Sequence, residues 1–162
     1  MEDYFDNLFC ASSCNQIEEC LNTVSAKVTP DMQDMLSRDF NADEIKVVVF
    51  QMGPTKALGP DGMNALFYQK FWHVVGDDVV NAMLEFLNDG IMLPTLNHTN
   101  IVLIPKVKNP EKMSEFRPIS LCNVIYKIIS KVLANMLKQV LPDIISPTQS
   151  AFVPVVLLQI MF

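Results

Sequence analysis

Apolar positions recur at helical spacing through much of the first hundred residues. Asn41 has Glu44 three positions later, as in a capping box, and apolar residues then follow at helical intervals: Ile45, Val48, Val49 and Met52. Gly53 and Pro54 come next, and this pair ends helices. The pattern therefore predicts a helix that begins at Asn41 and ends before Gly53.

Two more helices are expected between residues 65 and 90. The first covers residues 65 to 74, and its aromatic side chains have the spacing of core positions: Phe67, Phe71 and Trp72. The second begins at Asp77 and ends at Asn88 and Gly90, and its apolar positions are Val80, Met83, Leu84 and Leu87. Core packing is favoured for the aromatic residues over base stacking.

The stretch before these helices is rich in turn residues. Three glycines and two prolines lie between Gly53 and Asn64, but no Gly-Lys-Ser/Thr follows, which excludes a P-loop. Two interpretations remain open. The stretch is either a rigid connector or a glycine-rich contact with a nucleic-acid backbone.

A strand pattern begins at Ile101. The β-branched run 101–105 closes on a proline, a polar stretch with the turn signal Asn109-Pro110 follows, and residues 116–120 form a second extended segment. This order predicts a β-hairpin. Its basic residues are Lys106, Lys108 and Lys112 at the tip and Arg117 on the returning strand.

The longest predicted helix covers residues 123 to 141. Its apolar stripe comprises Ile125, Ile128, Ile129, Val132, Met136, Leu137 and Val140. Lys127, Lys131 and Lys138 fall on the opposite side, as an unpaired row. That row is either a solvated face or a surface that contacts phosphates.

Charge divides the chain at residue 100. Residues 1–100 hold 5 basic and 15 acidic residues, a net −10, whereas residues 101–162 hold 7 and 3, a net +4. The total of −6 argues against a nucleic-acid binder on average, but the asymmetry suggests that one part meets a polyanion. Half of the residues are hydrophobic, which is a globular composition.

The sequence favours an intracellular protein, nuclear or cytoplasmic. The acidic start has no secretory pattern, and no apolar run reaches the roughly 20 residues of a membrane span. Cys10, Cys14 and Cys20 lie close together without a nearby histidine, so reduced thiols are favoured over a zinc site; Cys122 is distant. No metal ligand is assigned.

Three segments together resemble the reverse transcriptase of LINE-type non-LTR retrotransposons, particularly the plant lineage. They are KALGPDGMNALFYQKFW, then LPTLNHTNIVLIPKVKNPEKMSEFRPISLCNVIYKIISKVLANMLK, then LPDIISPTQSAFVP. The middle segment is highly specific. The resemblance implies an α+β, mainly helical part of a right-hand polymerase, with helices before the fingers and then the fingers hairpin and long helix.

The resemblance also implies roles for the basic residues. Lys106 and Arg117 match positions expected to contact the triphosphate of an incoming deoxynucleotide, a task that suits bidentate Arg and mobile Lys. Contact with an RNA template or RNA–DNA hybrid is expected from the other positions: Lys108, Lys112, Pro118, Ile119, Lys127, Lys131, Lys138 and Gln149.

The chain departs from the family at three places. Leu58 stands where the family usually has Pro, Met136 stands where it tends to have Arg, and VVLLQIMF follows Pro154 where the family continues toward the palm. Nucleotidyl transfer needs two Mg²⁺ ions held by carboxylates, and the family's metal-binding motifs do not occur in this sequence. The expectation is a truncated reverse transcriptase that is inactive alone and holds no cofactor.

Three regions follow from these patterns: an acidic helical region (1–100), a partial fingers region (101–154) and a divergent hydrophobic tail (155–162). Two alternatives to a degenerate retroelement product remain. One is a non-catalytic RNA-binding module that uses the hairpin and long helix. The other is a helical protein-interaction fragment that uses the first hundred residues.

Overall fold

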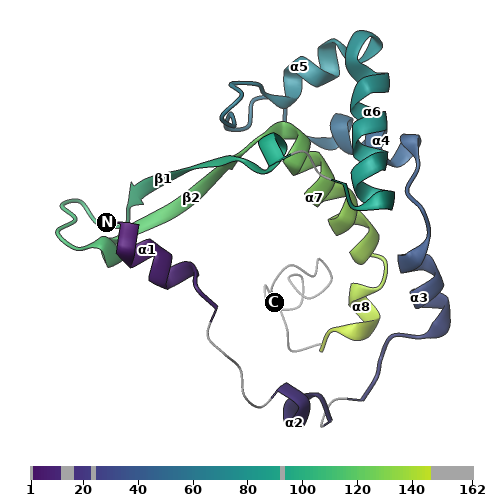
Figure 1. Cartoon of the computed structure of the whole chain (residues 1–162), viewed down its shortest axis with the longest axis horizontal. Helices are drawn as coiled ribbons and strands as arrows, with labels where there is room; N and C mark the ends of the chain where they lie inside the picture. Colours follow the sequence, from purple (N-terminus) through teal and green to yellow (C-terminus); the bar gives the residue numbers. More distant parts are fainter. Residues whose placement is uncertain (1, 12–16, 23–24, 92–93, 147–162) are drawn as a thin grey trace, which may run out of the picture. The chain divides into compact units, whose positions relative to one another are not determined.

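The computed structural model describes residues 2–11, 17–22, 25–91 and 94–146 (Figure 1). The elements in chain order are α1 (Glu2–Phe9), α2 (Ile17–Asn22), α3 (Pro30–Ser37), α4 (Ala42–Gln51), α5 (Ala65–Lys70), α6 (Trp72–Asp89), the 3-10 helix η1 (Pro94–Asn97), β1 (Thr99–Pro105), the 3-10 helix η2 (Met113–Glu115), β2 (Phe116–Cys122), α7 (Val124–Leu137) and α8 (Leu141–Ile144). The fold is α+β and mainly helical, as predicted.

The described residues form two compact units. One holds the residues up to Lys27 together with Ile101–Ile119, which is the outer part of the hairpin. The other, the helical unit, holds Val28–Asn100 and the residues from Ser120 onward. These two units are defined by contacts between residues. The three regions expected from the sequence are instead divided by charge and by family motifs.

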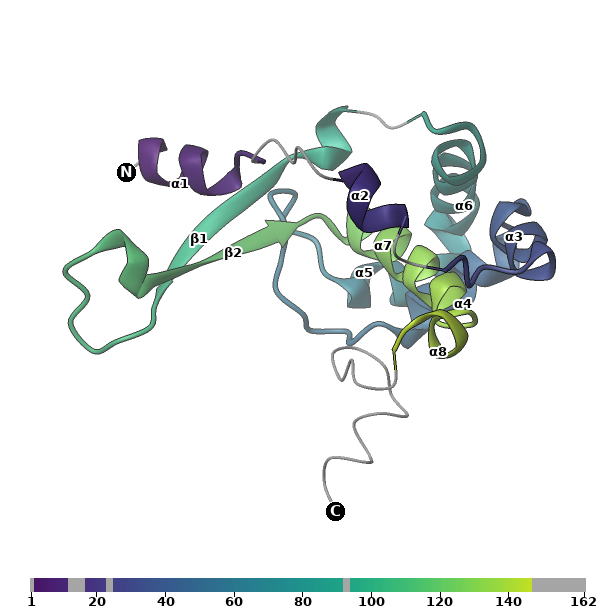
Figure 2. The ribbon, with the colours of Figure 1, turned by 90° about the horizontal axis from the view of Figure 1, so that it is seen from below.

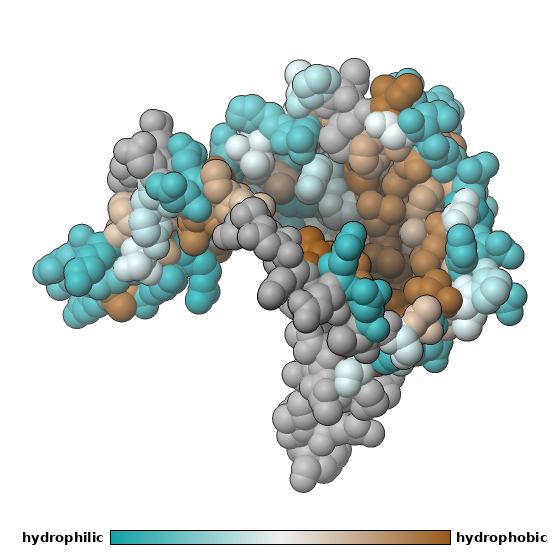
Figure 3. All heavy atoms as spheres, turned by 60° about the horizontal axis from the view of Figure 1, so that its bottom comes forward, coloured by the Kyte–Doolittle hydropathy of each residue, from teal (hydrophilic) through white to brown (hydrophobic). Residues whose placement is uncertain are grey.

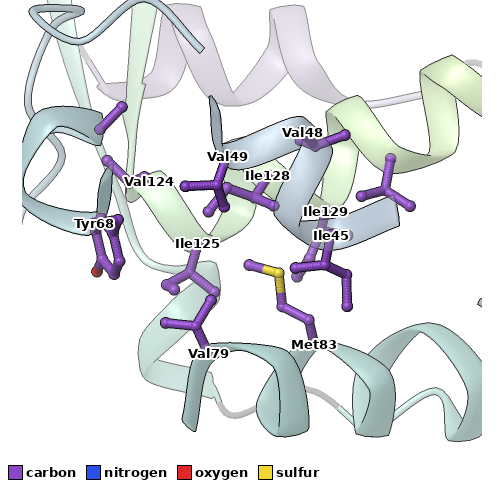
Figure 4. Packing of buried hydrophobic residues seen from close by; sticks show 12 residues of the cluster. Ile45, Val48, Val49, Tyr68, Val79, Met83, Val124, Ile125, Ile128 and Ile129 are labelled. Carbon is purple, nitrogen blue, oxygen red and sulfur yellow. The ribbon is translucent and has the colours of Figure 1, made fainter. Parts of the chain in front are cut away.

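The core of the helical unit lies between α4, α5, α6 and α7 (Figure 4). Side chains of Ile45, Met83 and Ile128 have no exposed surface. The other buried members of the cluster are Val48, Val49, Ala65, Tyr68, Val79, Val124, Ile125, Ile129 and Val132. Burying this apolar surface on one side of each amphipathic helix is the main source of stability for the unit.

Helix α4 begins as the sequence predicts. The Asn41 side chain accepts the Glu44 N–H, and the Glu44 carboxylate accepts the Asn41 N–H, which completes the capping box. At the other end, Gln69 Nε2 donates to the carbonyls of Val49 and Met52 at 2.8 and 2.9 Å. Both ends of α4 therefore have hydrogen-bond partners for backbone groups that have no partner within the helix.

The predicted boundary between the next two helices is wrong. Helix α5 ends at Lys70 and α6 begins at Trp72, because Phe71 leaves the helical region at φ −103° and ψ 21°. Gly76, just before the predicted start, lies inside α6, where a Cβ would be 2.9 Å from the Trp72 ring. Gly90 ends α6 in the left-handed conformation, as expected for a helix C-terminus.

The aromatic residues near this boundary divide between core and surface. Phe67 and Trp72 pack against the core cluster, as predicted, whereas Phe71 is 40% exposed. The core prediction is therefore wrong for Phe71. Its position between the two helices places its ring beside Phe67 rather than in the cluster.

Helix α7 is shorter than predicted. It ends at Leu137, because the N–H groups of Gln139 and Val140 donate three residues back, to the Met136 and Leu137 carbonyls, and form a turn; α8 then starts at Leu141. Leu137 is 42% exposed, so the predicted stripe is wrong at that position, while Val140 is buried. Ile125, Ile128, Ile129 and Val132 belong to the core cluster, and Met136 is half-buried.

The hairpin prediction is confirmed. Strands β1 and β2 pair as a two-stranded sheet, and the tip joins their outer ends (Figure 2). Among the described residues, no helix is long and apolar enough to cross a membrane.

Candidate nucleic-acid interface on the hairpin

The two strands pair in one antiparallel register from root to tip. The Lys106 N–H donates to the Glu115 carbonyl at 2.7 Å, and Thr99 Oγ1 donates to Cys122 Sγ at 3.5 Å. Both contacts fit the register that pairs Ile104 with Arg117. Because side chains alternate along a strand, Arg117 then shares one face of the hairpin with Ile104.

That face is the more exposed one. Val102, Ile104, Arg117 and Ile119 lie on it and all are exposed, whereas the opposite face carries the half-buried Leu103, Phe116 and Pro118 together with the exposed Ile101. Pro118 and Ile119 therefore point to opposite faces of the hairpin. Their contact with a templating base stays a prediction.

The tip, residues 106–115, is held by hydrogen bonds to Glu115. Glu115 Oε2 accepts the N–H groups of Glu111 and Lys112 at 2.6 and 3.0 Å. The Glu115 N–H in turn donates to the Lys112 carbonyl at 3.0 Å. The hydrogen bonds to Oε2 lower the pKa of the Glu115 carboxyl, and the bond from the Lys112 N–H has a larger effect than the bond from the Glu111 N–H.

Four basic side chains lie on this ordered tip and its returning strand. Lys106, Lys108, Lys112 and Arg117 are all exposed, and residues 106–117 hold two acidic residues against these four. Lys106 Nζ donates to the Ser114 carbonyl at 2.8 Å. The structure shows no ion pair for any of the four within the described part of the chain. In Figure 3, hydrophilic residues cover the outer end of the hairpin.

The lysines of α7 differ in their surroundings, although none of the three forms an ion pair within the described residues. Lys127 Nζ donates to the Ala57 carbonyl at 2.7 Å. The reason is that the glycine-rich loop, residues 53–64, lies against the start of α7. Lys131 is half-buried, and Lys138 is exposed but follows the end of the helix.

Asn123 fastens this loop, a role that the sequence analysis missed. The side chain is buried, and its Oδ1 accepts the Asp61 N–H at 3.3 Å while its Nδ2 donates to the Thr95 carbonyl at 3.5 Å. A Cβ at Gly59 would lie 2.6 Å from Asn123 Cα. Of the two open interpretations, these contacts favour the rigid connector. A polar residue between a strand and an apolar helix is the signal that could have identified Asn123.

The cysteines show no metal site within the described residues. Cys10 is exposed and Cys122 half-buried, both with free thiols, and no group of three or more His, Cys, Asp or Glu side chains comes together there. Cys14 and Gln149 lie outside the described residues, as does the side chain of Cys20. The predicted template contact of Gln149 stays a prediction.

Comparisons with known proteins bear on the origin of the chain. No protein-family model matches the sequence. The chain is similar to a protein of Xenopus laevis described as the transposon TX1 uncharacterized 149 kDa protein, with 28% identity over 156 residues. The match covers 93% of this chain and 12% of that protein, so the chain spans about an eighth of its relative. The similarity supports a transposon origin for this chain.

Proposed function

We propose that this chain is a fingers segment of a reverse transcriptase from a LINE-type non-LTR retrotransposon, and that its hairpin binds nucleic-acid phosphates. The observation that carries the proposal is the cluster of exposed cations on an ordered tip, none of them in an ion pair within the described residues: Lys106, Lys108, Lys112 and Arg117. The similarity to a transposon protein and the motifs around the hairpin support it.

The geometry suits phosphate binding for a physical reason. Exposed cations on a surface attract a polyanion and release its counterions. The resulting gain in binding free energy does not depend on base sequence. Arg117 can grip phosphate oxygens through two N–H groups, and Lys106 and Lys108 add point charges near the tip. The triphosphate of a deoxynucleotide carries the same chemistry in concentrated form.

The exposed face around Arg117 adds apolar surface. Val102, Ile104 and Ile119 lie on that face, so a base or sugar could pack beside the arginine while its phosphate meets the guanidinium. Ile119 is the member that the family resemblance places near the templating base. The proposal concerns binding, since the motifs that the family uses for metal ions are not among those matched.

The α7 lysines have a smaller part in the proposal. Lys127 Nζ donates to a carbonyl, as Lys106 Nζ does on the tip, and Lys127, Lys131 and Lys138 all stay proposed template-contact positions of this helix. The contribution of these lysines to RNA binding is best measured in variants of their own, because they belong to the helical unit and the hairpin cations belong to the other unit.

Filter binding of single-stranded RNA over a range of salt concentrations tests the proposal. We expect log K to fall with log salt by about 0.7 for each phosphate contacted. Replacing both Lys106→Ala and Arg117→Ala should weaken binding about tenfold or more at low salt and make the slope shallower. A deoxynucleoside triphosphate added as competitor tests whether the same cations hold the nucleotide.

The matched control removes two exposed lysines from the helical unit, Lys46→Ala with Lys56→Ala. It changes the net charge equally but leaves the hairpin intact, so its RNA affinity should fall less than that of the hairpin variant. Equal losses in both variants would show a diffuse charge effect and overturn the hairpin site. Absence of RNA binding by the unaltered chain at low salt would overturn the proposed function.

A further inference from the structure

An acidic residue organises the most basic part of the chain. Glu115 lies between the tip and β2, close in sequence to Lys112 and Arg117, where a negative charge opposes the approach of phosphate. Simple charge counting says that removing it should tighten phosphate binding. The contacts of its side chain point the other way.

The Glu115 carboxylate holds the backbone on which the cations stand. One of its oxygens accepts both the Glu111 and the Lys112 N–H, and its own backbone bonds to Lys106 and Lys112. Lys106 Nζ also reaches the neighbouring Ser114 carbonyl. Removing this carboxylate leaves two backbone N–H groups without their acceptor, so the segment from 106 to 115 loses its main internal support.

The other acidic residue of the tip, Glu111, provides a comparison for Glu115. Glu111 has the same charge and lies on the same tip, and its side chain makes no hydrogen bond or ion pair within the described residues. Glu111 therefore contributes charge alone, whereas Glu115 contributes charge and geometry. The two residues separate the effects that a single substitution would mix.

We infer that Glu115 is a positioning residue for phosphate binding by the hairpin, and that its removal weakens binding although it makes the tip more positive. This inference rests on the proposed function. It assigns no contact between Glu115 and the ligand, because the carboxylate acts through the backbone that carries Lys106 and Lys112.

Fluorescence anisotropy with a labelled single-stranded oligouridine at low salt tests the inference on the full chain. Glu111→Ala should bind about twofold more tightly than the unaltered chain, because only a repulsive charge is lost. Glu115→Ala should bind about tenfold more weakly than Glu111→Ala, despite its identical net charge. Glu115→Gln, which keeps an acceptor oxygen, should recover most of the difference.

Amide hydrogen exchange without RNA provides a second readout. Exchange at the Glu111 and Lys112 amides should accelerate in Glu115→Ala and remain unchanged in Glu111→Ala. If the unaltered chain binds oligouridine and Glu115→Ala binds as tightly as Glu111→Ala, the positioning role is wrong while the hairpin site stands. If the unaltered chain does not bind, the proposed function fails, and the exchange result alone then reports whether Glu115 orders the tip.

Discussion

The core of the helical unit and the tip of the hairpin are held together in different ways. In the core, apolar side chains such as Ile45, Met83 and Ile128 are fully buried, and helices contribute one face each. At the tip, most side chains are exposed, and hydrogen bonds to the Glu115 carboxylate order the backbone. The residues that stabilise the fold are therefore not the residues that carry the positive charge. A substitution can alter the stability of the core or the charge of the tip with little effect on the other.

The largest expected effect is the loss of stability on truncating the core. Ile128→Ala removes a fully buried side chain and should lower the free energy of unfolding by about 2–5 kcal/mol. Urea denaturation followed by far-UV circular dichroism measures it. Ile104→Ala in the hairpin is the control, because the 46% exposed side chain leaves no comparable cavity and should cost less than about 1 kcal/mol. Similar losses for both variants would break the comparison.

A smaller effect is expected where the glycine-rich loop meets α7. Gly59→Ala would place a Cβ 2.6 Å from Asn123 Cα and should cost about 1–3 kcal/mol, since backbone must move to admit it. The neighbouring exposed Leu58→Ala is the control, and it should change stability by less than about 0.5 kcal/mol. Thermal melts of both variants measure the difference. A Gly59→Ala chain as stable as the Leu58→Ala chain would show that the loop does not press on Asn123.

The smallest effect concerns the ion pair before α4. The hydrogen bond from Arg38, opposed by burial, lowers the pKa of Glu44 below 4.5. A lowered folded-state pKa gives stability that is present above pH 4.5 and is lost as the pH falls through the lowered value. Glu44→Gln should therefore cost less than about 1 kcal/mol near neutral pH, because Arg38 is partly exposed and solvent screens the pair.

Urea denaturation of the Glu44→Gln variant at several pH values checks this sign. The difference from the unaltered chain should shrink as the pH falls below 4.5. A difference that grows in acid would contradict the lowered pKa. RNA affinity, measured near neutral pH, should be the same for both chains, which sharpens the separation between the two regions.

Local sequence signals predicted the parts of the fold that depend on neighbouring residues. The capping box at Asn41, the left-handed end at Gly90 and the hairpin follow from such signals and are confirmed. The start of α6 could not be predicted, because Phe71 leaves the helical region without a glycine or proline beside it to mark the break. The end of α7 at Leu137 could not be predicted from the apolar stripe, because the buried Val140 continues the stripe beyond the turn.

The candidate site was predictable in composition but not in organisation. The four cations were visible as residue types, and their exposure agrees with the expectation of a basic tip. The bond from Lys127 to Ala57 joins residues far apart in sequence, so no local pattern could show it. Glu115 was missed because a carboxylate in a basic turn looks like a simple counter-charge until its acceptor bonds are seen.

Hydrogen–deuterium exchange of the full chain with and without single-stranded RNA tests the central claim most directly, because it locates the bound region. The account predicts that RNA slows exchange over residues 106–117 while α4 and α6 exchange as before. Protection confined to the helical unit, with the hairpin unchanged at saturating RNA, would contradict the claim that the hairpin cations form the phosphate-binding surface.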